Sequence, residues 1–129
     1  MSYAFRHDAE LGIFRIHFQG HVDMDQILRS DKEIISTPQW PGSRCILSTL
    51  EPDTDLSALT VEQYLNVAMP YMQATQDLRG AGAREAWIIP ERWKSPIIQV
   101  WEHLPLKDDH HAFAVFEGEA AALAWLLAD

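Results

Sequence analysis

The chain has 129 residues, of which 47% are hydrophobic, and nineteen acidic against ten basic residues give it a formal net charge of −9. This length suits a single domain, residues 1–129, whose core needs neither a disulfide nor a metal ion for stability. The acidic charge and the scattered Lys and Arg residues exclude general binding to nucleic acids or anionic membranes. A single cysteine excludes an intramolecular disulfide. Without a signal peptide or an apolar run of membrane-spanning length, we expect a cytoplasmic protein.

Two alternating segments at the start of the chain predict a β-hairpin. Residues 3–6 and 13–18 alternate apolar and polar side chains, and the polar, Gly-containing stretch 8–12 joins them. A helix follows, because Asp23 and Gln26 have the spacing of a capping box. The first 30 or so residues therefore predict two strands and the start of a helix.

The middle of the chain continues as helix, strand and helix. Pro38 ends the first helix, and the apolar run 44–50 predicts the next strand. Thr60 and Gln63 form a second capping box, and Pro70 inside the second helix predicts a kink or a break, because proline lacks a backbone donor. The side chains expected to form the buried stripe of this helix are Val61, Leu65, Ala68, Met69 and Met72.

The last third of the chain adds two strands and two helices. Residues 86–89 are apolar on both faces, as in a central strand, and a third helix runs from Ser95-Pro96 to Pro105. The strand 112–116 leads into a closing helix with an acidic first turn. In this helix we expect small residues to face the sheet and larger ones, with a largely buried tryptophan, to supply bulk: Ala121, Ala124 and Ala128, and Leu123, Trp125 and Leu127. The predicted order is ββαβαβαβα, which is an α/β fold.

At this point the order of elements and several short segments resemble a known family. The segments are Gly-His-Val-Asp-Met-Asp-Gln at 20–26, the strand after Gly42, Trp-Ile-Ile-Pro at 87–90, and Val-Phe at 115–116 followed by Ala-Leu-Ala-Trp-Leu at 122–126. Together with the starting hairpin they resemble the STAS domain superfamily, in particular the SpoIIAA-like group of anti-sigma-factor antagonists, over nearly the whole chain. The resemblance implies a mixed five-stranded sheet packed against amphipathic helices. It also implies a non-enzymatic module that binds a protein or a small apolar ligand.

One segment departs from the family pattern. Signalling members carry a phosphorylatable serine in an Asp-Ser-Ser-Gly type motif at the start of the helix after the central strand, whereas residues 53–58 read Asp-Thr-Asp-Leu-Ser-Ala. Ser57 and Thr54 are the nearest candidates for a phosphoacceptor, but neither precedes a glycine. The simpler interpretation is that Ser57 and Asp55 satisfy backbone donors of the loop and helix start.

Three tryptophans predict a second candidate surface. Trp87, Trp93 and Trp101 come from a strand, the next loop and the next helix, so they could line a cleft at the carboxyl end of the central strand. A core position is the simpler interpretation for Trp87 and Trp101. Trp93 lies between Arg92 and Lys94, which favours an exposed contact with a partner or an acyl chain. The candidate partner or ligand surface is therefore Arg92, Trp93, Lys94 and Trp101.

The sequence shows no pattern typical of a catalytic or metal site. Cys45 lies in an apolar run and predicts an inert thiol, and the histidines at 21 and 110–111 lack the spacing of zinc ligands. No nucleophile elbow, phosphate loop or dinucleotide fingerprint occurs, so we expect no metal, no cofactor and no enzymatic activity.

Two functional hypotheses remain. The first is a STAS-like module that binds a protein partner in regulation, which predicts an exposed patch around residues 51–57 and the second helix. The alternative is a carrier or sensor of a small apolar ligand such as a lipid or fatty acid, which predicts a closed cavity between the second and third helices. A homodimer is compatible with either.

Overall fold

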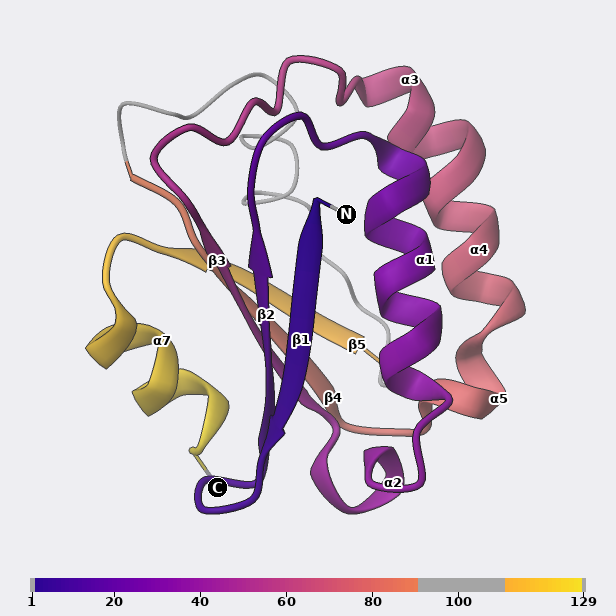
Figure 1. The fold of residues 1–129 in the computed structure, drawn as a ribbon. Helices are drawn as coiled ribbons and strands as arrows, with labels where there is room; N and C mark the ends of the chain where they lie inside the picture. The colour runs from indigo at the N-terminus through magenta and orange to yellow at the C-terminus, as the bar shows by residue number, and fades with distance from the viewer. Residues whose placement is uncertain (1, 91–110, 129) are drawn as a thin grey trace.

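The computed structural model describes residues 2–90 and 111–128, which form an α/β fold around a five-stranded mixed sheet (Figure 1). The strands lie side by side in chain order, with the first two antiparallel and each later strand parallel to its neighbour. They are β1 (Tyr3–Asp8), β2 (Ile13–Phe18), β3 (Cys45–Leu50), β4 (Ala83–Ile88) and β5 (His111–Phe116). The predicted α/β class and the mixed five-stranded sheet are therefore confirmed.

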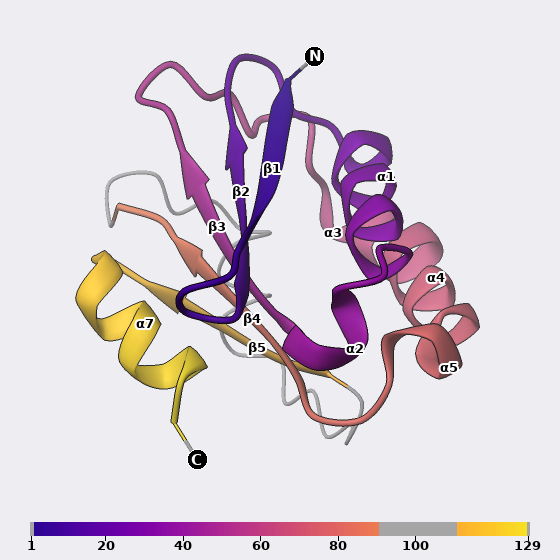
Figure 2. The same cartoon turned by 60° about the horizontal axis from the view of Figure 1, so that its bottom comes forward.

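Helices cover both faces of this sheet. α1 and the segment from α3 to α5 lie on one face, and α7 lies on the other (Figures 1 and 2). The helices are α1 (Met24–Ile35), α2 (Trp40–Ser43), α3 (Val61–Gln63), the π-helical turn η1 (Tyr64–Ala68), α4 (Met69–Ala74), α5 (Gln76–Arg79) and α7 (Glu119–Leu126). The third helix predicted from the sequence, residues 95–105, lies outside the described residues.

The signals for helix starts are confirmed by reciprocal hydrogen bonds. The Asp23 carboxylate accepts the Gln26 N–H at 2.9 Å, and the Gln26 side chain accepts the Asp23 N–H at 3.0 Å. Thr60 and Gln63 make the same pair of bonds at the start of α3, at 3.1 and 3.3 Å. Each pair satisfies two donors, one of them a first-turn N–H that has no partner within its helix.

The larger hydrophobic core lies between the sheet and the helices on the α1 side. Trp87 of β4 is 1% exposed and stacks on Phe18 of β2, with 5.2 Å between the ring centroids. Trp40 is equally buried, and its indole N–H donates to a backbone carbonyl of α5 at 2.8 Å. It begins α2, a short helix that the sequence analysis does not predict. Arg44 closes α2 with a positive φ of 56°, so β3 begins one residue later than expected.

The smaller core lies between the other face of the sheet and α7. The α7 side chains buried there are Ala122 and Leu126, which are one turn apart and pack with Ile13, Leu47 and Ala86. The prediction that the small side chains at 121, 124 and 128 face the sheet is wrong, because all three are exposed. α7 is apolar on all sides, so its sequence does not mark the buried face.

Trp125 is half-buried at the side of α7, so the expectation of a largely buried ring is wrong. Its ring lies 5.8 Å from that of Phe116, and the Arg84 guanidinium lies 6.0 Å from its centroid. Arg84 also donates to the carbonyl oxygens of Trp125 and Ala128, at 3.0 and 2.6 Å. A cation at this position satisfies free carbonyls at the helix C-terminus and complements the helix dipole.

Cys45 lies beneath the end of α7. Its thiol is half-buried and donates to the Leu126 carbonyl oxygen at 3.5 Å. Burial raises the pKa of the Cys45 thiol, with a smaller opposing effect from the charge of Arg84. A thiol that stays protonated is a poor nucleophile, which favours the inert role predicted for it.

Candidate functional site

The loop between β3 and α3, residues 51–57, lies beside the connection from β2 to α1, and we call it the acidic loop. The Val22 N–H donates to the Asp55 carbonyl oxygen at 3.0 Å, and the Asp55 N–H donates to the Gly20 carbonyl oxygen at 2.8 Å. The Asp55 carboxylate accepts the Ser57 N–H at 2.9 Å. Hydrogen bonds from Ser57, and then from His21, hold the pKa of Asp55 below its ordinary value. The acidic loop therefore presents an ionised carboxylate next to Ser57.

The two candidate phosphoacceptors in the acidic loop differ in access. Ser57 is exposed and hydrogen-bonds only locally, to Asp55. Thr54 is half-buried, and its hydroxyl donates to the Phe18 carbonyl oxygen at 3.1 Å, tying the acidic loop to β2. Of the two, Ser57 has the hydroxyl that a modifying enzyme could reach.

The helical segment after the acidic loop carries exposed apolar side chains. Leu65 is 51% exposed, Val67 48% and Met69 38%; we call these three residues the helix patch. The prediction that Leu65 and Met69 belong to a buried stripe is wrong, whereas Ala68 is buried as expected. The apolar face of this helix is therefore split between the core and the surface.

The π-helical turn η1 explains this division. The Met69 N–H donates to the Tyr64 carbonyl oxygen, five residues earlier, where an α-helix would use the residue four back. Leu65 and Val67 lie within this turn and Met69 follows it directly, so the exposed side chains belong to the part of the helix where the regular α-helical period is interrupted. The helix continues through Pro70 into α4, so the proline marks a change in hydrogen bonding and does not end the helix.

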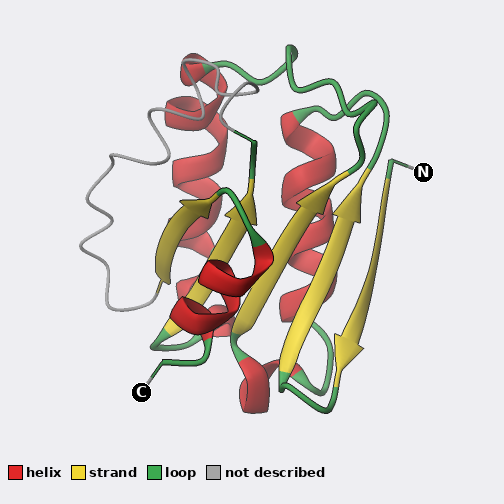
Figure 3. Ribbon diagram, turned by 90° about the vertical axis from the view of Figure 1, so that its left-hand side faces the viewer, coloured by secondary structure: helices red, strands yellow, loops and turns green. Residues whose placement is uncertain are grey.

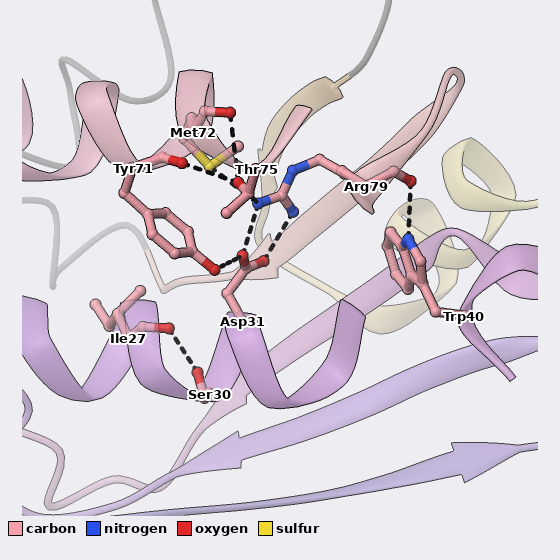
Figure 4. Close-up of polar contacts among 8 residues, drawn as sticks. All are labelled: Ile27, Ser30, Asp31, Trp40, Tyr71, Met72, Thr75 and Arg79. Atoms are coloured by element: carbon pink, nitrogen blue, oxygen red, sulfur yellow. Dashed lines mark hydrogen bonds and ion pairs between the residues drawn. The ribbon is translucent and has the colours of Figure 1, made fainter. Parts of the chain in front are cut away.

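A buried ion pair attaches this helical segment to α1 (Figure 4). Arg79 donates to both carboxylate oxygens of Asp31, at 2.9 and 2.6 Å, and their side chains are 1% and 9% exposed. The Tyr71 hydroxyl donates to the same carboxylate at 2.6 Å, and the Thr75 hydroxyl oxygen accepts from Arg79 at 3.2 Å. We call these four residues the anchor cluster. Both charges are paired and hydrogen-bonded, as buried charges must be.

The anchor cluster has the chemistry of a structural contact. Burial, and then the negative charge of Asp31, raise the pKa of Tyr71 above its ordinary value of 10.0, so the phenol remains a protonated donor. The carboxylate and the guanidinium are occupied by each other. The cluster therefore holds α4 and α5 against α1 and presents the helix patch on a fixed element.

A second candidate site lies on the opposite face of the sheet. α7 packs against β3, β4 and β5 and contacts the start of β2 at Ile13 and Arg15, and it leaves β1 and the rest of β2 uncovered (Figure 3). A hollow of about 390 Å³ lies on this uncovered part. The side chains that line it include Ala4, Arg6, Arg15, His17, Thr49 and Glu119. Arg15 donates to Asp8 at 2.9 Å and to Glu119 at 2.7 Å, so it ties the first turn of α7 to the hairpin.

Three side chains at this hollow form a continuous chain of hydrogen bonds, which we call the surface relay. His17 Nδ1 lies 2.7 Å from Thr49 Oγ1, and His17 Nε2 lies 2.7 Å from Glu51 Oε1. The His17 and Glu51 side chains are 43% and 46% exposed, so the relay is open to solvent. Within the described ranges, no carboxylate comes within ion-pair distance of the guanidinium of Arg6, which lines the same hollow.

Sequence analysis missed the surface relay. Alternation along residues 13–18 does place His17 on the face opposite to the larger core. Thr49 and Glu51 lie more than thirty residues further along, however, and only the parallel pairing of β2 with β3 brings them to His17. A test of outward-facing polar positions on neighbouring predicted strands could have found the relay.

The candidate surface predicted at Arg92, Trp93, Lys94 and Trp101 lies outside the described residues. Within residues 2–90 and 111–128, no group of His, Cys, Asp or Glu side chains is arranged to hold a metal ion. The same residues contain no helix with the length and apolar character needed to cross a membrane.

Comparison with protein-family models, with curated proteins and with solved structures finds no match to this chain. Its function therefore has to be inferred from its own residues.

Proposed function

We propose that this chain is an interaction module of the STAS, SpoIIAA-like kind, which binds a protein partner through the helix patch and the acidic loop. The α/β architecture, with a starting hairpin and three parallel strand pairs, is compatible with that family. The exposed helix patch, which follows the acidic loop in the chain, is the observation that carries the proposal.

The helix patch is unusual among the exposed apolar side chains of the described residues. Among the described residues, five large apolar side chains are exposed, and three of these five belong to the stretch 65–69. Isolated exposed apolar side chains are ordinary on soluble proteins, whereas a group of them marks an interaction surface. Leu78 and Leu127, the other two, are separated from this group and from each other along the chain.

The acidic side chains that precede the helix patch in the chain indicate the chemistry of the partner. Glu51, Asp53 and Asp55 lie in the acidic loop, and Glu62 is in the first turn of α3. A segment with an apolar face and flanking Lys or Arg side chains would complement both features, and the net charge of −9 would speed its association.

Ser57 provides a means of regulating this surface. A phosphate there would add about two negative charges beside the Asp55 carboxylate. It would also replace the hydrogen bonds between Ser57 and Asp55 that shape the acidic loop. We expect phosphorylation to reorganise the loop and release the partner, and Ser57→Ala to prevent that release.

The test begins with capture of partners by the immobilised chain from an extract of its source cells, followed by purification of the partner that binds. Calorimetry then compares the parent with the double variant Leu65→Ser/Met69→Ser and with Leu78→Ser as the matched control. We expect at least a roughly tenfold loss of affinity for the double variant, because buried apolar contacts dominate interface energies, and no change for the control. If the partner binds the double variant and the parent with equal affinity, the helix patch is not the binding surface.

The alternative of an apolar-ligand carrier is tested on the same sample. Saturable quenching of tryptophan fluorescence by a fatty acid, complete at one equivalent, would support the carrier and count against the interaction module. We expect no saturable change, since an acyl chain in the hollow of about 390 Å³ would have to lie against the charged side chains of Arg6, Arg15 and Glu119 as well as the apolar ones.

A further inference from the structure

The surface relay is held in place by the backbone of the sheet. His17 and Thr49 are register partners across the parallel β2–β3 pair, and both line the hollow beside α7. Side chains opposite each other on adjacent strands are held at contact distance by the ladder of backbone hydrogen bonds. The 2.7 Å contact between His17 Nδ1 and Thr49 Oγ1 is therefore supported by rigid elements, as a reactive pair requires.

The hydrogen-bond partners of His17 define its tautomer. Glu51 Oε1 is a carboxylate oxygen and can only accept, so the proton on the neutral ring lies on Nε2. Nδ1 then carries a lone pair directed at Thr49, whose hydroxyl donates to it. The other acceptor near this hydroxyl, the Ile16 carbonyl oxygen, is further away at 3.4 Å. Thr49 is thus paired with a base, and the base is oriented by a carboxylate.

The surroundings leave room for a ligand beside this pair. On the other side of His17, the register partner in β1 is Ala4, whose small side chain leaves the hollow open next to the imidazole. The volume of about 390 Å³ lies in the range of sites for small molecules. Arg6 lines the same hollow and, among the described residues, interacts with the Asp8 carboxylate only at longer range and forms no ion pair, so it supplies a positive charge for an anionic ligand.

We infer that Thr49 is a nucleophile activated by His17 and Glu51, and that it accepts an acyl group from small esters that carry a negative charge. A hydroxyl, an imidazole and a carboxylate linked in this order are the arrangement used for nucleophilic catalysis on unrelated folds. This activity is separate from the proposed partner binding and uses the opposite face of the sheet.

The chemical step balances with an ester and water as the only reactants. Thr49 Oγ1 attacks the ester carbonyl carbon while His17 Nδ1 takes the hydroxyl proton, and Glu51 stabilises the imidazolium. Collapse of the tetrahedral intermediate breaks the bond to the leaving alkoxide, which takes the proton from His17. The products are the alcohol and acyl-Thr49. Water then attacks the acyl group with the same proton transfers, which releases the carboxylic acid and restores the Thr49 hydroxyl.

The test uses the full chain with two chromogenic probes, 4-nitrophenyl acetate and the anionic mono-4-nitrophenyl ester of succinic acid. We expect a burst of one nitrophenolate per chain, and an acyl group on the peptide that contains Thr49 in tandem mass spectrometry. The succinyl ester should react faster than the acetyl ester. A burst without an acyl group on Thr49, or no burst with either probe, would overturn the inference.

Variants separate the relay from ordinary surface reactivity. Thr49→Val should lower the burst rate by about 100-fold or more, and Thr49→Ser, which keeps the hydroxyl, should restore it. Thr37→Val is the matched control, because the Thr37 hydroxyl donates to the backbone carbonyl oxygen of Ile34 at 2.8 Å, after the end of α1, so its burst should equal that of the parent. A Thr49→Val protein that reacts like the parent would overturn the inference.

The charge preference is tested at Arg6. Arg6→Gln should remove most of the preference for the succinyl over the acetyl ester, because a binding contact to a remote charge affects only the substrate that carries it. Arg29→Gln, a substitution on the exposed surface of α1, serves as the control. An unchanged preference in Arg6→Gln would refute the assignment of an anionic substrate.

Discussion

The anchor cluster and the surface relay use the same chemical groups in opposite surroundings. Each joins a carboxylate, a nitrogen group and a hydroxyl by hydrogen bonds of 2.6 to 2.9 Å. The ion-paired side chains of the anchor cluster are 1% and 9% exposed, whereas the corresponding side chains of the surface relay are 43% and 46% exposed. Burial therefore separates two clusters whose chemistry is otherwise alike.

The comparison shows how surroundings decide the role of a polar cluster. In the anchor cluster every charge is matched inside the protein, and loss of one partner leaves the other without water or a counter-charge. In the surface relay water can replace any lost partner, so the relay contributes little to stability and its hydroxyl remains accessible to a ligand. The cluster that stabilises the fold and the cluster that we propose to be reactive thus lie on opposite faces of the sheet.

The largest effect is expected from removal of the buried carboxylate. Asp31→Ala leaves the Arg79 guanidinium buried without its counter-charge and should lower the free energy of unfolding by about 3–5 kcal/mol. Urea denaturation followed by circular dichroism measures the change. The control is Asp25→Ala, which breaks an exposed pair with Arg29 on the same helix and should change stability by less than about 1 kcal/mol. Equal stability of the two variants would erase the distinction between the clusters.

A smaller effect, with a characteristic pH dependence, is expected from Tyr71→Phe. Loss of a hydrogen bond to a charged group should cost about 1.5–3 kcal/mol at neutral pH. The pKa of Tyr71 is raised in the folded protein, so the unfolded chain loses this proton first, and the parent loses stability as the pH rises through the ordinary tyrosine value of 10.0. The free energy of unfolding of the variant should fall less steeply than that of the parent over this pH range.

Tyr3→Phe is the comparison for this alkaline measurement, because burial, and then a hydrogen bond to Glu33 on the exposed side of α1, also raise the pKa of Tyr3, so it shows how much any buried tyrosine contributes. We expect its cost at neutral pH to be less than about 1 kcal/mol. A Tyr71→Phe protein that loses stability with alkaline pH as steeply as the parent would show that this phenol is not protected by the anchor cluster.

The smallest change in stability is expected at the surface relay. His17→Gln should alter the free energy of unfolding by less than about 0.5 kcal/mol, as is usual for exposed side chains. The same variant should lose the acylation of Thr49, because Gln offers no basic nitrogen. A destabilisation comparable to that of Asp31→Ala would mean that the relay is structural, and the contrast between the two clusters would fail.

Much of the local structure is predictable from short segments. The hairpin, the two capping boxes and the strand positions depend on residues within a few positions of one another, and the structure confirms them. The buried stripe of the second helix is not predictable in this way. Its periodicity assumes regular α-helical turns, whereas this helix contains a π-helical turn before Pro70, and Leu65 within that turn and Met69 directly after it are exposed.

The closing helix shows the same limit for a different reason. Its position after the last strand follows from the sequence. Every side of it is apolar, however, so the pattern does not select Ala122 and Leu126 as the residues that contact the sheet. Their burial is decided by how α7 lies across β3 and β4.

The sequence by itself determined the α/β class, the starts of the helices and the acidic character of the surface, because these properties are local or additive along the chain. The tertiary structure alone decided the two clusters. Asp31 and Arg79 are 48 residues apart, and His17 and Thr49 are 32 residues apart. Such pairs meet only when helix packing and strand register bring distant segments together, and their burial, which separates an anchor from a reactive group, is a property of the folded chain.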